Sequence, residues 1–122
     1  MSYVYDIKNN KMIKKERFDR RLQELARFAR GISHPARLAI LQYLAETRTC
    51  ISGDISDNIP LSRSTVSQHL RELRDLGLIH GEVEGLRINY SLCGSAVRKF
   101  DTMMTDYLKM LDASCDGEKC CE

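Results

Sequence analysis

One segment, residues 62–79, constrains the fold of this chain more than any other. Ser62 can cap the N-terminus of a helix, and Gly77 can end that helix. Between them, apolar residues recur at i, i+4 and i+7, and on a wheel of about 100° per residue the opposite face is polar. The apolar stripe is Val66, Leu70 and Leu73, and the polar face is Ser64, Ser67, Gln68 and Arg71. The segment therefore predicts a helix with one face in a core and the other exposed.

Apolar periodicity predicts three helices before this one and a long helix near the C-terminus. They cover residues 18–29, 33–46, 52–59 and 97–111. Gly31 ends the first of them, and Ser33 is expected to cap the second, with Pro35 in its first turn. Ser52 can cap the short third helix, which Pro60 closes because proline cannot continue the hydrogen-bonding pattern.

Two runs of alternating residues, 78–83 and 87–92, predict a β-hairpin that turns at Glu84 and Gly85. The resulting order, four helices, a hairpin and a last helix, is that of a winged helix-turn-helix. The predicted fold is therefore mainly α with a small β-hairpin, and 122 residues suffice for one such domain. We expect an N-terminal arm at 1–15, a domain for DNA binding and dimerisation at 16–111, and a cysteine-rich tail at 112–122.

Charge is distributed unevenly along the chain. Residues 8–37 hold ten lysines and arginines against three acidic residues, whereas residues 112–122 hold four acidic residues and one lysine. Such an asymmetry is typical of a protein whose basic part faces a polyanion, although a solvated charged helix face has the same composition.

In a helix-turn-helix the second helix enters the major groove of DNA, which makes the segment from Ser62 the predicted recognition helix. Its small hydroxyl residues allow close approach to phosphates, Gln68 can read adenine, and Arg71 can reach a phosphate or guanine. Arg87 in the hairpin can contact the backbone or minor groove, although Glu82 and Glu84 weaken that contribution. The predicted DNA-binding residues are Ser62, Ser64, Thr65, Ser67, Gln68, Arg71 and Arg87. A polar helix that binds a protein partner is the alternative.

The runs HPARLAILQYL at 34–44, LSRSTVSQHLRELRDLGLI at 61–79 and EGLRINYSL at 84–92 resemble the ArsR/SmtB family of metal-responsive transcriptional repressors, and in particular its arsenic repressors. The resemblance covers most of residues 18–111, and the middle run is the most specific. It implies a homodimer built from the first and last helices, which binds double-stranded operator DNA when free of ligand and releases it when ligand binds. A symmetric partner would also cover the apolar excess of those two helices.

Two ligand sites of that family are incomplete here. Members that sense through the third helix resemble ELCVCDL, whereas this chain reads TCISGDI and keeps one thiol, Cys50. Members that sense zinc through the last helix use aspartate and histidine, whereas the last helix here offers Asp101 and Asp106 without a histidine.

The tail offers three thiols within seven residues, Cys115, Cys120 and Cys121. Three thiolates suit a soft ion, so As(III) or Sb(III) is the predicted inducer, bound by these residues. Cadmium, lead or zinc are alternatives, with Cys93 or Cys50 as a fourth ligand. Oxidation of neighbouring thiols to a disulfide or persulfide is a further alternative that would switch the same repressor.

Several classes of protein are not expected. Five cysteines without a secretory signal indicate reduced thiols, and no run of about 18 apolar residues is present, so we expect a cytoplasmic protein without a membrane span. An enzyme is not expected either, because the sequence shows no nucleotide-binding loop, no ordered catalytic triad and no metal-water constellation.

Overall fold

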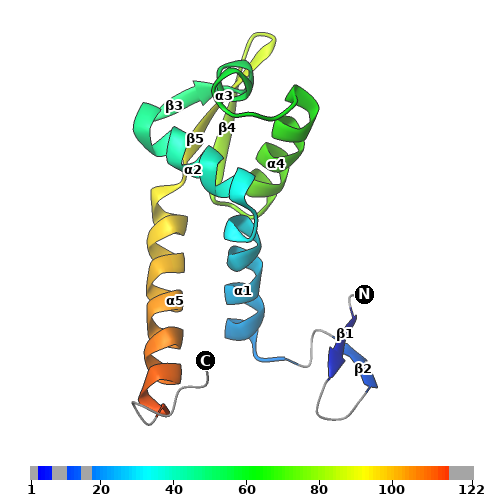
Figure 1. Cartoon of the computed structure of the whole chain (residues 1–122), viewed down its shortest axis with the longest axis vertical. Helices are drawn as coiled ribbons and strands as arrows, with labels where there is room; N and C mark the ends of the chain where they lie inside the picture. The colour runs from blue at the N-terminus through cyan, green and yellow to red at the C-terminus, as the bar shows by residue number, and fades with distance from the viewer. Residues whose placement is uncertain (1–2, 7–10, 15–17, 116–122) are drawn as a thin grey trace.

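The computed structural model describes residues 3–6, 11–14 and 18–115, with the backbone path alone at 3–6, 11–14 and 49–53 (Figure 1). The helices are α1 (Arg20–Ala29), η2 (Arg30–Ile32, a 3-10 turn), α2 (Pro35–Thr47), α3 (Ser52–Asn58), α4 (Arg63–Asp75) and α5 (Gly94–Ala113). The strands are β1 (Tyr3–Asp6), β2 (Lys11–Lys14), β3 (Thr49–Ile51), β4 (Ile79–Glu84) and β5 (Arg87–Leu92). Among the described residues, no helix is both long and apolar enough to cross a membrane.

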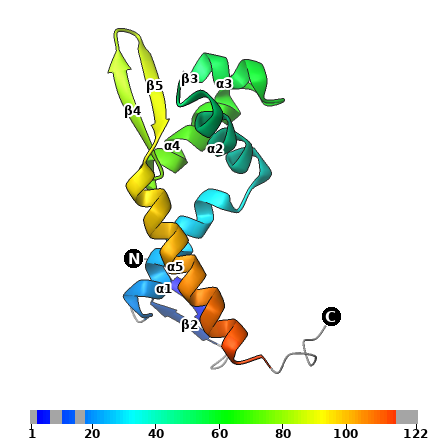
Figure 2. The ribbon, with the colours of Figure 1, turned by 90° about the vertical axis from the view of Figure 1, so that its left-hand side faces the viewer.

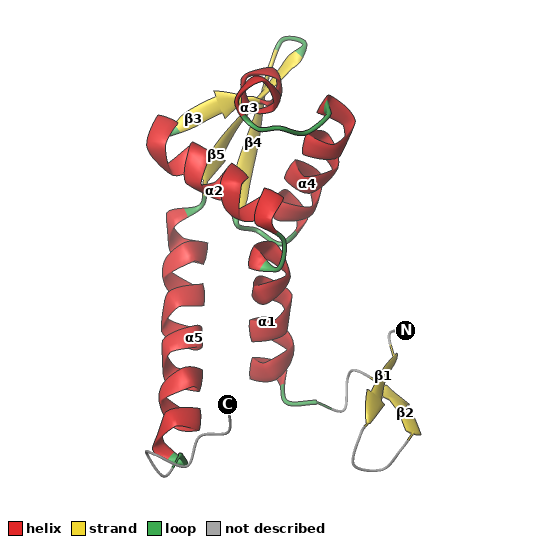
Figure 3. Cartoon of the chain, viewed as in Figure 1, coloured by secondary structure: helices red, strands yellow, loops and turns green. Residues whose placement is uncertain are grey.

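Helices α2, α3 and α4 pack with a three-stranded sheet of order β3-β5-β4, and we call this unit, residues 35–92, the winged part (Figure 3). Both strand pairings of this sheet are antiparallel, and β4 and β5 form the predicted hairpin. The mainly α winged helix-turn-helix fold predicted from the sequence is therefore confirmed.

The core of the winged part forms where the apolar stripes of its helices meet the sheet. Its most deeply buried side chains are Ile40, Leu44, Ile55, Val66, Leu70, Leu73 and Ile79. Tyr90 of β5 closes the core from the sheet side. The stripe at Val66, Leu70 and Leu73 is completely inaccessible to solvent, as the heptad-like spacing predicts, and this burial fixes the rotation of α4 about its axis.

Helices α1 and α5 extend from one side of the winged part, and we call them the stalk (Figure 1). Phe28 and Phe100 join them by an edge-to-face contact, with ring centroids 5.7 Å apart. An ion pair between Glu24 and Lys99 adds a second link. Figure 2 shows that the β4–β5 hairpin and the far end of α5 lie at opposite ends of the molecule.

The structure corrects several boundaries expected from the sequence. Ser33 does not cap α2: His34 does, because the backbone N–H of Ala36 donates to His34 Nδ1 at 3.0 Å. The Ser33 hydroxyl instead donates to the carbonyl of Arg30 at 2.9 Å, because Ser33 closes the 3-10 turn η2. Helix α5 begins at Gly94, one turn before the predicted start.

Four elements were not predicted. The turn η2 continues α1 past Ala29, and β3 adds a third strand to the hairpin through the pairing of Cys50 with Tyr90. Within the expected N-terminal arm, β1 and β2 pair antiparallel with Tyr3 opposite Lys14.

Candidate nucleic-acid interface

Three hydroxyl groups hold the start of α4. Ser62 Oγ accepts a hydrogen bond from the backbone N–H of Thr65 at 3.3 Å and donates to Thr65 Oγ1 at 2.8 Å. Ser64 Oγ lies 3.2 Å from Ser62 Oγ. Ser62 thus caps the helix as the sequence predicts, and Thr65 is half-buried. These hydroxyls therefore hold the N-terminus of α4, where the positive end of the helix dipole lies.

The polar face of α4 is exposed to solvent. Ser64, Ser67, Gln68 and Arg71 are all exposed, opposite the buried stripe, so the predicted two-faced helix is confirmed. Arg63, the first residue of α4, is exposed on the same end and was not among the predicted DNA-binding residues. Its position directly after the capping serine is the signal that could have found it, because cations there reach a phosphate bound at the helix start.

Arg37 of α2 fixes the other side of α4. Its guanidinium forms an ion pair with Glu72 and donates from Nε to His69 Nδ1 at 3.3 Å. It also donates to the carbonyl of Arg30, so one side chain joins α2, α4 and η2. From the sequence, Arg37 is only one of the basic residues of 8–37, because its partners on α4 lie 32 and 35 residues away.

His69 therefore lies against α2 and does not belong to the exposed face. Its ring packs against that of His34, with centroids 4.9 Å apart. Burial lowers the pKa of His69, and the nearby His34 and Arg37 lower it further. This neutral histidine accepts the Arg37 hydrogen bond and so helps to set the orientation of α4.

The hairpin turns through two residues, Gly85 and Leu86. Gly85 has φ +63°, which suits the first position of a type II′ turn. Glu84 lies opposite Arg87 in the register of the hairpin. Cross-strand neighbours point to the same face of the sheet, which here is the face away from the buried Tyr90. Arg87 is exposed and forms no ion pair with any described residue, while Leu86 at the tip is fully exposed. The wing thus offers one cation beside two acidic residues, Glu82 and Glu84.

The predicted thiol site lies at the far end of α5. Cys115 is exposed two residues after the end of α5, and its Sγ donates to the carbonyl of Leu111 at 3.5 Å. Cys120 and Cys121 lie outside the described residues, as does the side chain of Cys50. Within the described part of the chain, no three side chains of the metal-binding types come together. Asp101 and Asp106, which the sequence analysis set aside, are both exposed on α5.

Cys93 lies at the opposite end of α5, where it is the N-cap residue. A hydrogen bond from the Ser95 hydroxyl lowers the pKa of the Cys93 thiol, and the backbone N–H of Ala96 lowers it further. A helix of 20 residues separates Cys93 from Cys115. Because such a helix is about 30 Å long, one ion cannot bind both Cys93 and Cys115 of the same chain.

Comparison with known proteins identifies relatives of this chain. Residues 34–80 match the family of bacterial regulatory proteins of the arsR type. The chain is 37% identical over 75 residues to the HTH-type transcriptional regulator YgaV of Escherichia coli K12, a match that covers 62% of this chain and 76% of YgaV. It is 30% identical over 90 residues to a transcriptional repressor SmtB homolog of Synechocystis, covering 74% of this chain and 67% of the homolog.

Solved structures agree with the fold. An ArsR-like transcriptional regulator from Rhodococcus sp. RHA1 superposes with a TM-score of 0.66, at 24% identity, over 75% of this chain and 86% of that one. The family match at residues 34–80 includes the capped helix α4, and the relatives are DNA-binding regulators, not enzymes. The chain therefore belongs to the ArsR/SmtB family of winged helix-turn-helix transcriptional repressors, as the sequence motifs indicate.

Proposed function

We propose that this chain represses transcription as a homodimer and that a soft thiophilic ion, arsenite or antimonite, releases it from its operator by binding Cys115, Cys120 and Cys121. The observation that carries the DNA-binding part is the exposed polar face of α4, held in one orientation by the buried stripe and by Arg37. The observation that supports the sensing part is the exposed thiol of Cys115 two residues after the end of α5, followed by two more cysteines.

The exposed face of α4 suits the major groove in size and chemistry. Ser64 and Ser67 are short enough to let the helix approach the base edges, and Gln68 carries the donor and acceptor that pair with adenine. Arg71 contacts guanine or a phosphate, and Arg63 contacts a phosphate near the helix start. The cap hydroxyls of Ser62 and Thr65 act mainly by holding this start in place, while Arg87 adds a weaker contact from the wing.

The stalk supports a homodimer. Apolar side chains of the stalk are exposed in the single chain, and on α5 three of them recur at helical spacing on one face: Val97, Leu108, which is 53% exposed, and Leu111. Leu22 of α1 is exposed as well. A second copy that packs its stalk on this one would bury these side chains symmetrically and place two α4 helices about 34 Å apart, one turn of DNA.

The proposed switch requires only modest coupling. A 100-fold loss of operator affinity corresponds to roughly 3 kcal/mol, which is within the usual range for allosteric proteins. The ion must then bind the released state 100-fold more tightly than the DNA-bound state. Three thiolates at the end of the stalk can supply this difference, because the stalk helices also set the distance between the two recognition helices.

The test is fluorescence anisotropy with a labelled DNA fragment from upstream of the protein's own gene, titrated with arsenite and, separately, with cadmium and zinc. We expect arsenite to release the wild-type protein at about one equivalent per tail. The double substitution Cys120→Ser/Cys121→Ser should bind DNA as before and ignore arsenite, whereas Cys50→Ser should respond normally. Release of the double variant by arsenite would contradict the tail site. Release by cadmium or zinc but not by arsenite would show that the sensed ion is a different one, while the proposed site at the tail cysteines would stand.

Thiol oxidation is the second candidate, and the lowered pKa of Cys93 favours it, since thiolates react faster with oxidants than thiols. Release by hydrogen peroxide in the absence of any ion, lost in Cys93→Ser, would replace ion sensing by redox sensing. Retention of release in Cys93→Ser together with loss in the tail variant would place the oxidation at the tail.

A further inference from the structure

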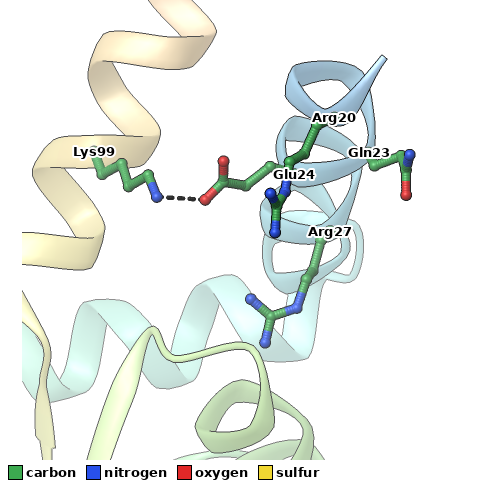
Figure 4. Close-up of a pocket in the computed structure, with 5 residues that line it drawn as sticks. All are labelled: Arg20, Gln23, Glu24, Arg27 and Lys99. Atoms are coloured by element: carbon green, nitrogen blue, oxygen red, sulfur yellow. Dashed lines mark hydrogen bonds and ion pairs between the residues drawn. The ribbon is translucent and has the colours of Figure 1, made fainter. Parts of the chain in front are cut away.

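A basic pocket lies between the two helices of the stalk (Figure 4). It has a volume of about 490 Å³ and is lined by Arg20, Gln23, Glu24, Arg27 and Lys99. The α1 residues Arg20, Glu24 and Arg27 recur at i, i+4 and i+7, so they form one stripe of the helix, and Lys99 approaches from α5. The pocket is thus a product of the packing of α1 against α5.

The pocket carries an excess of positive charge. Lys99 is paired with Glu24, which leaves the two arginines without a carboxylate. Arg27 donates to the backbone carbonyl of Asp75 at 2.6 Å, a contact that leaves its charge uncompensated. Arg20 forms no ion pair with any described residue. Cations held this close together repel one another, so an anionic group that enters the pocket would be stabilised.

The chain itself contains an acidic segment of suitable length. Residues 112–122 hold Asp112, Asp116, Glu118 and Glu122 against one lysine. Helix α5 ends at Ala113, which lies 14 residues after Lys99, a distance of about 21 Å along the helix. The residues after Ala113 can extend about 3.3 Å each, so Glu118 reaches about 17 Å back and Glu122 about 30 Å. Because α1 runs antiparallel to α5, Arg20 lies on the side of the pocket nearer the tail (Figure 1).

We propose that the part of the acidic tail that follows α5, residues 114–122, docks on the basic pocket of the same chain. Its carboxylates pair with Arg20 and Arg27, and the docked tail holds its cysteines alongside the helices of the stalk. The proposal goes beyond ion sensing because it concerns the tail without an ion and the protein without DNA. In the ion-free protein, the cysteines of the tail would be held at the docked position, and binding of an ion would have to release them from it.

The test measures where the tail lies, by cross-linking with a short bismaleimide. Cys120 is kept as the only native thiol, with serine at positions 50, 93, 115 and 121. A second thiol is introduced by Thr102→Cys, one turn after Lys99 and about 60° around the helix from it, or by Thr105→Cys, about 120° around the helix from Lys99. Both threonines are exposed and Thr105 is nearer to the tail in sequence, which makes it a matched control. Circular dichroism verifies that each variant is folded.

Docking predicts that Cys120 cross-links with position 102 about tenfold faster than with position 105 at low salt, the combined effect of two or three exposed ion pairs. The preference should disappear at about 0.5 M salt, where charges are screened within a few ångströms. Arg20→Gln/Arg27→Gln should also remove it, whereas Lys109→Gln, an exposed cation elsewhere on α5, should not. Equal rates at the two positions, or cross-links only between chains, would overturn the proposal. Neither DNA nor arsenite is present, so this result is independent of the proposed sensing.

Discussion

The winged part and the stalk differ in how completely each one buries its own apolar residues. In the winged part, Ile40, Leu44, Val66, Leu70 and Leu73 are inaccessible to solvent. In the stalk, α5 has no buried residue along its 20 positions. The winged part therefore has a core that is closed to solvent within one chain, whereas the apolar side chains of α5 stay partly accessible to solvent. The winged part holds the DNA-binding surface in shape by itself, whereas the stalk has its apolar surface available for a second copy.

The largest expected effect is on the free energy of unfolding, through the buried core of the winged part. Leu70→Ala should lower the free energy of unfolding by about 2–5 kcal/mol, because it removes a fully buried side chain and leaves a cavity under α4. Leu108→Ala, in the stalk, should cost far less at a protein concentration that keeps the oligomeric state constant. Urea unfolding monitored by circular dichroism measures both. An equal loss in the free energy of unfolding for both variants would show that the stalk buries its apolar side chains as completely as the winged part does.

The next effect concerns association. Leu108→Glu should raise the dimer dissociation constant by a factor of about 100 or more, because it places a charge in the apolar surface that the proposed second copy would cover. Its circular dichroism spectrum should match that of the wild type. Sedimentation equilibrium gives the dissociation constant, and Lys109→Ala, at the next position, is the control. A monomeric wild-type protein would contradict the proposal that a second copy covers the exposed apolar side chains of the stalk.

Within the winged part, the two DNA-facing elements should differ. Arg71→Ala should weaken operator binding by about 10- to 100-fold, as expected for loss of one base or phosphate contact from the recognition helix. Arg87→Ala in the wing should have a smaller effect, since Glu82 and Glu84 already offset its charge. Anisotropy at one fixed salt concentration ranks the two. A larger loss for Arg87→Ala would make the wing the main contact.

The smallest effect is on pH dependence. The pKa of His69 is lowered by burial, so the unfolded chain binds a proton more readily than the folded one. The stability that this neutral histidine contributes is complete above its ordinary pKa of about 6.5 and is lost as the pH falls through the lower, folded value. The free energy of unfolding should therefore fall between pH 7 and pH 5, and less steeply in His69→Gln than in the wild type. His80→Gln, exposed on β4, should follow the wild type.

Local signals predicted the elements, and contacts between distant residues account for most of what was missed. The apolar stripe and the serine cap of α4 are encoded within 15 residues, and they gave the rotation of that helix correctly. Strand β3 is only three residues long and shows no periodicity, so it exists because β5 offers an edge to pair with. The choice of His34 over Ser33 as the cap of α2 depended on a preceding 3-10 turn that no residue pattern announces.

The same distinction applies to the candidate sites. The exposed residues of α4 could be predicted because a single helix determines which of them face outward. The contacts of Arg37 with His69 and Glu72 could not, because they depend on how α2 crosses α4. The basic pocket joins Glu24 to Lys99 across 75 residues of sequence, and only the packing of the stalk brings them together.

A single residue, Cys93, separates the last residue of β5 from the first residue of α5. The wing and the cysteine tail are therefore attached to the two ends of one stiff rod, and α5 can act as a lever with its pivot at Cys93. A tilt of about 5° at the pivot displaces the far end of a helix about 30 Å long by roughly 2.5 Å. Conversely, a rearrangement of that size at the tail, comparable to one hydrogen-bond length, is enough to turn the wing relative to the stalk.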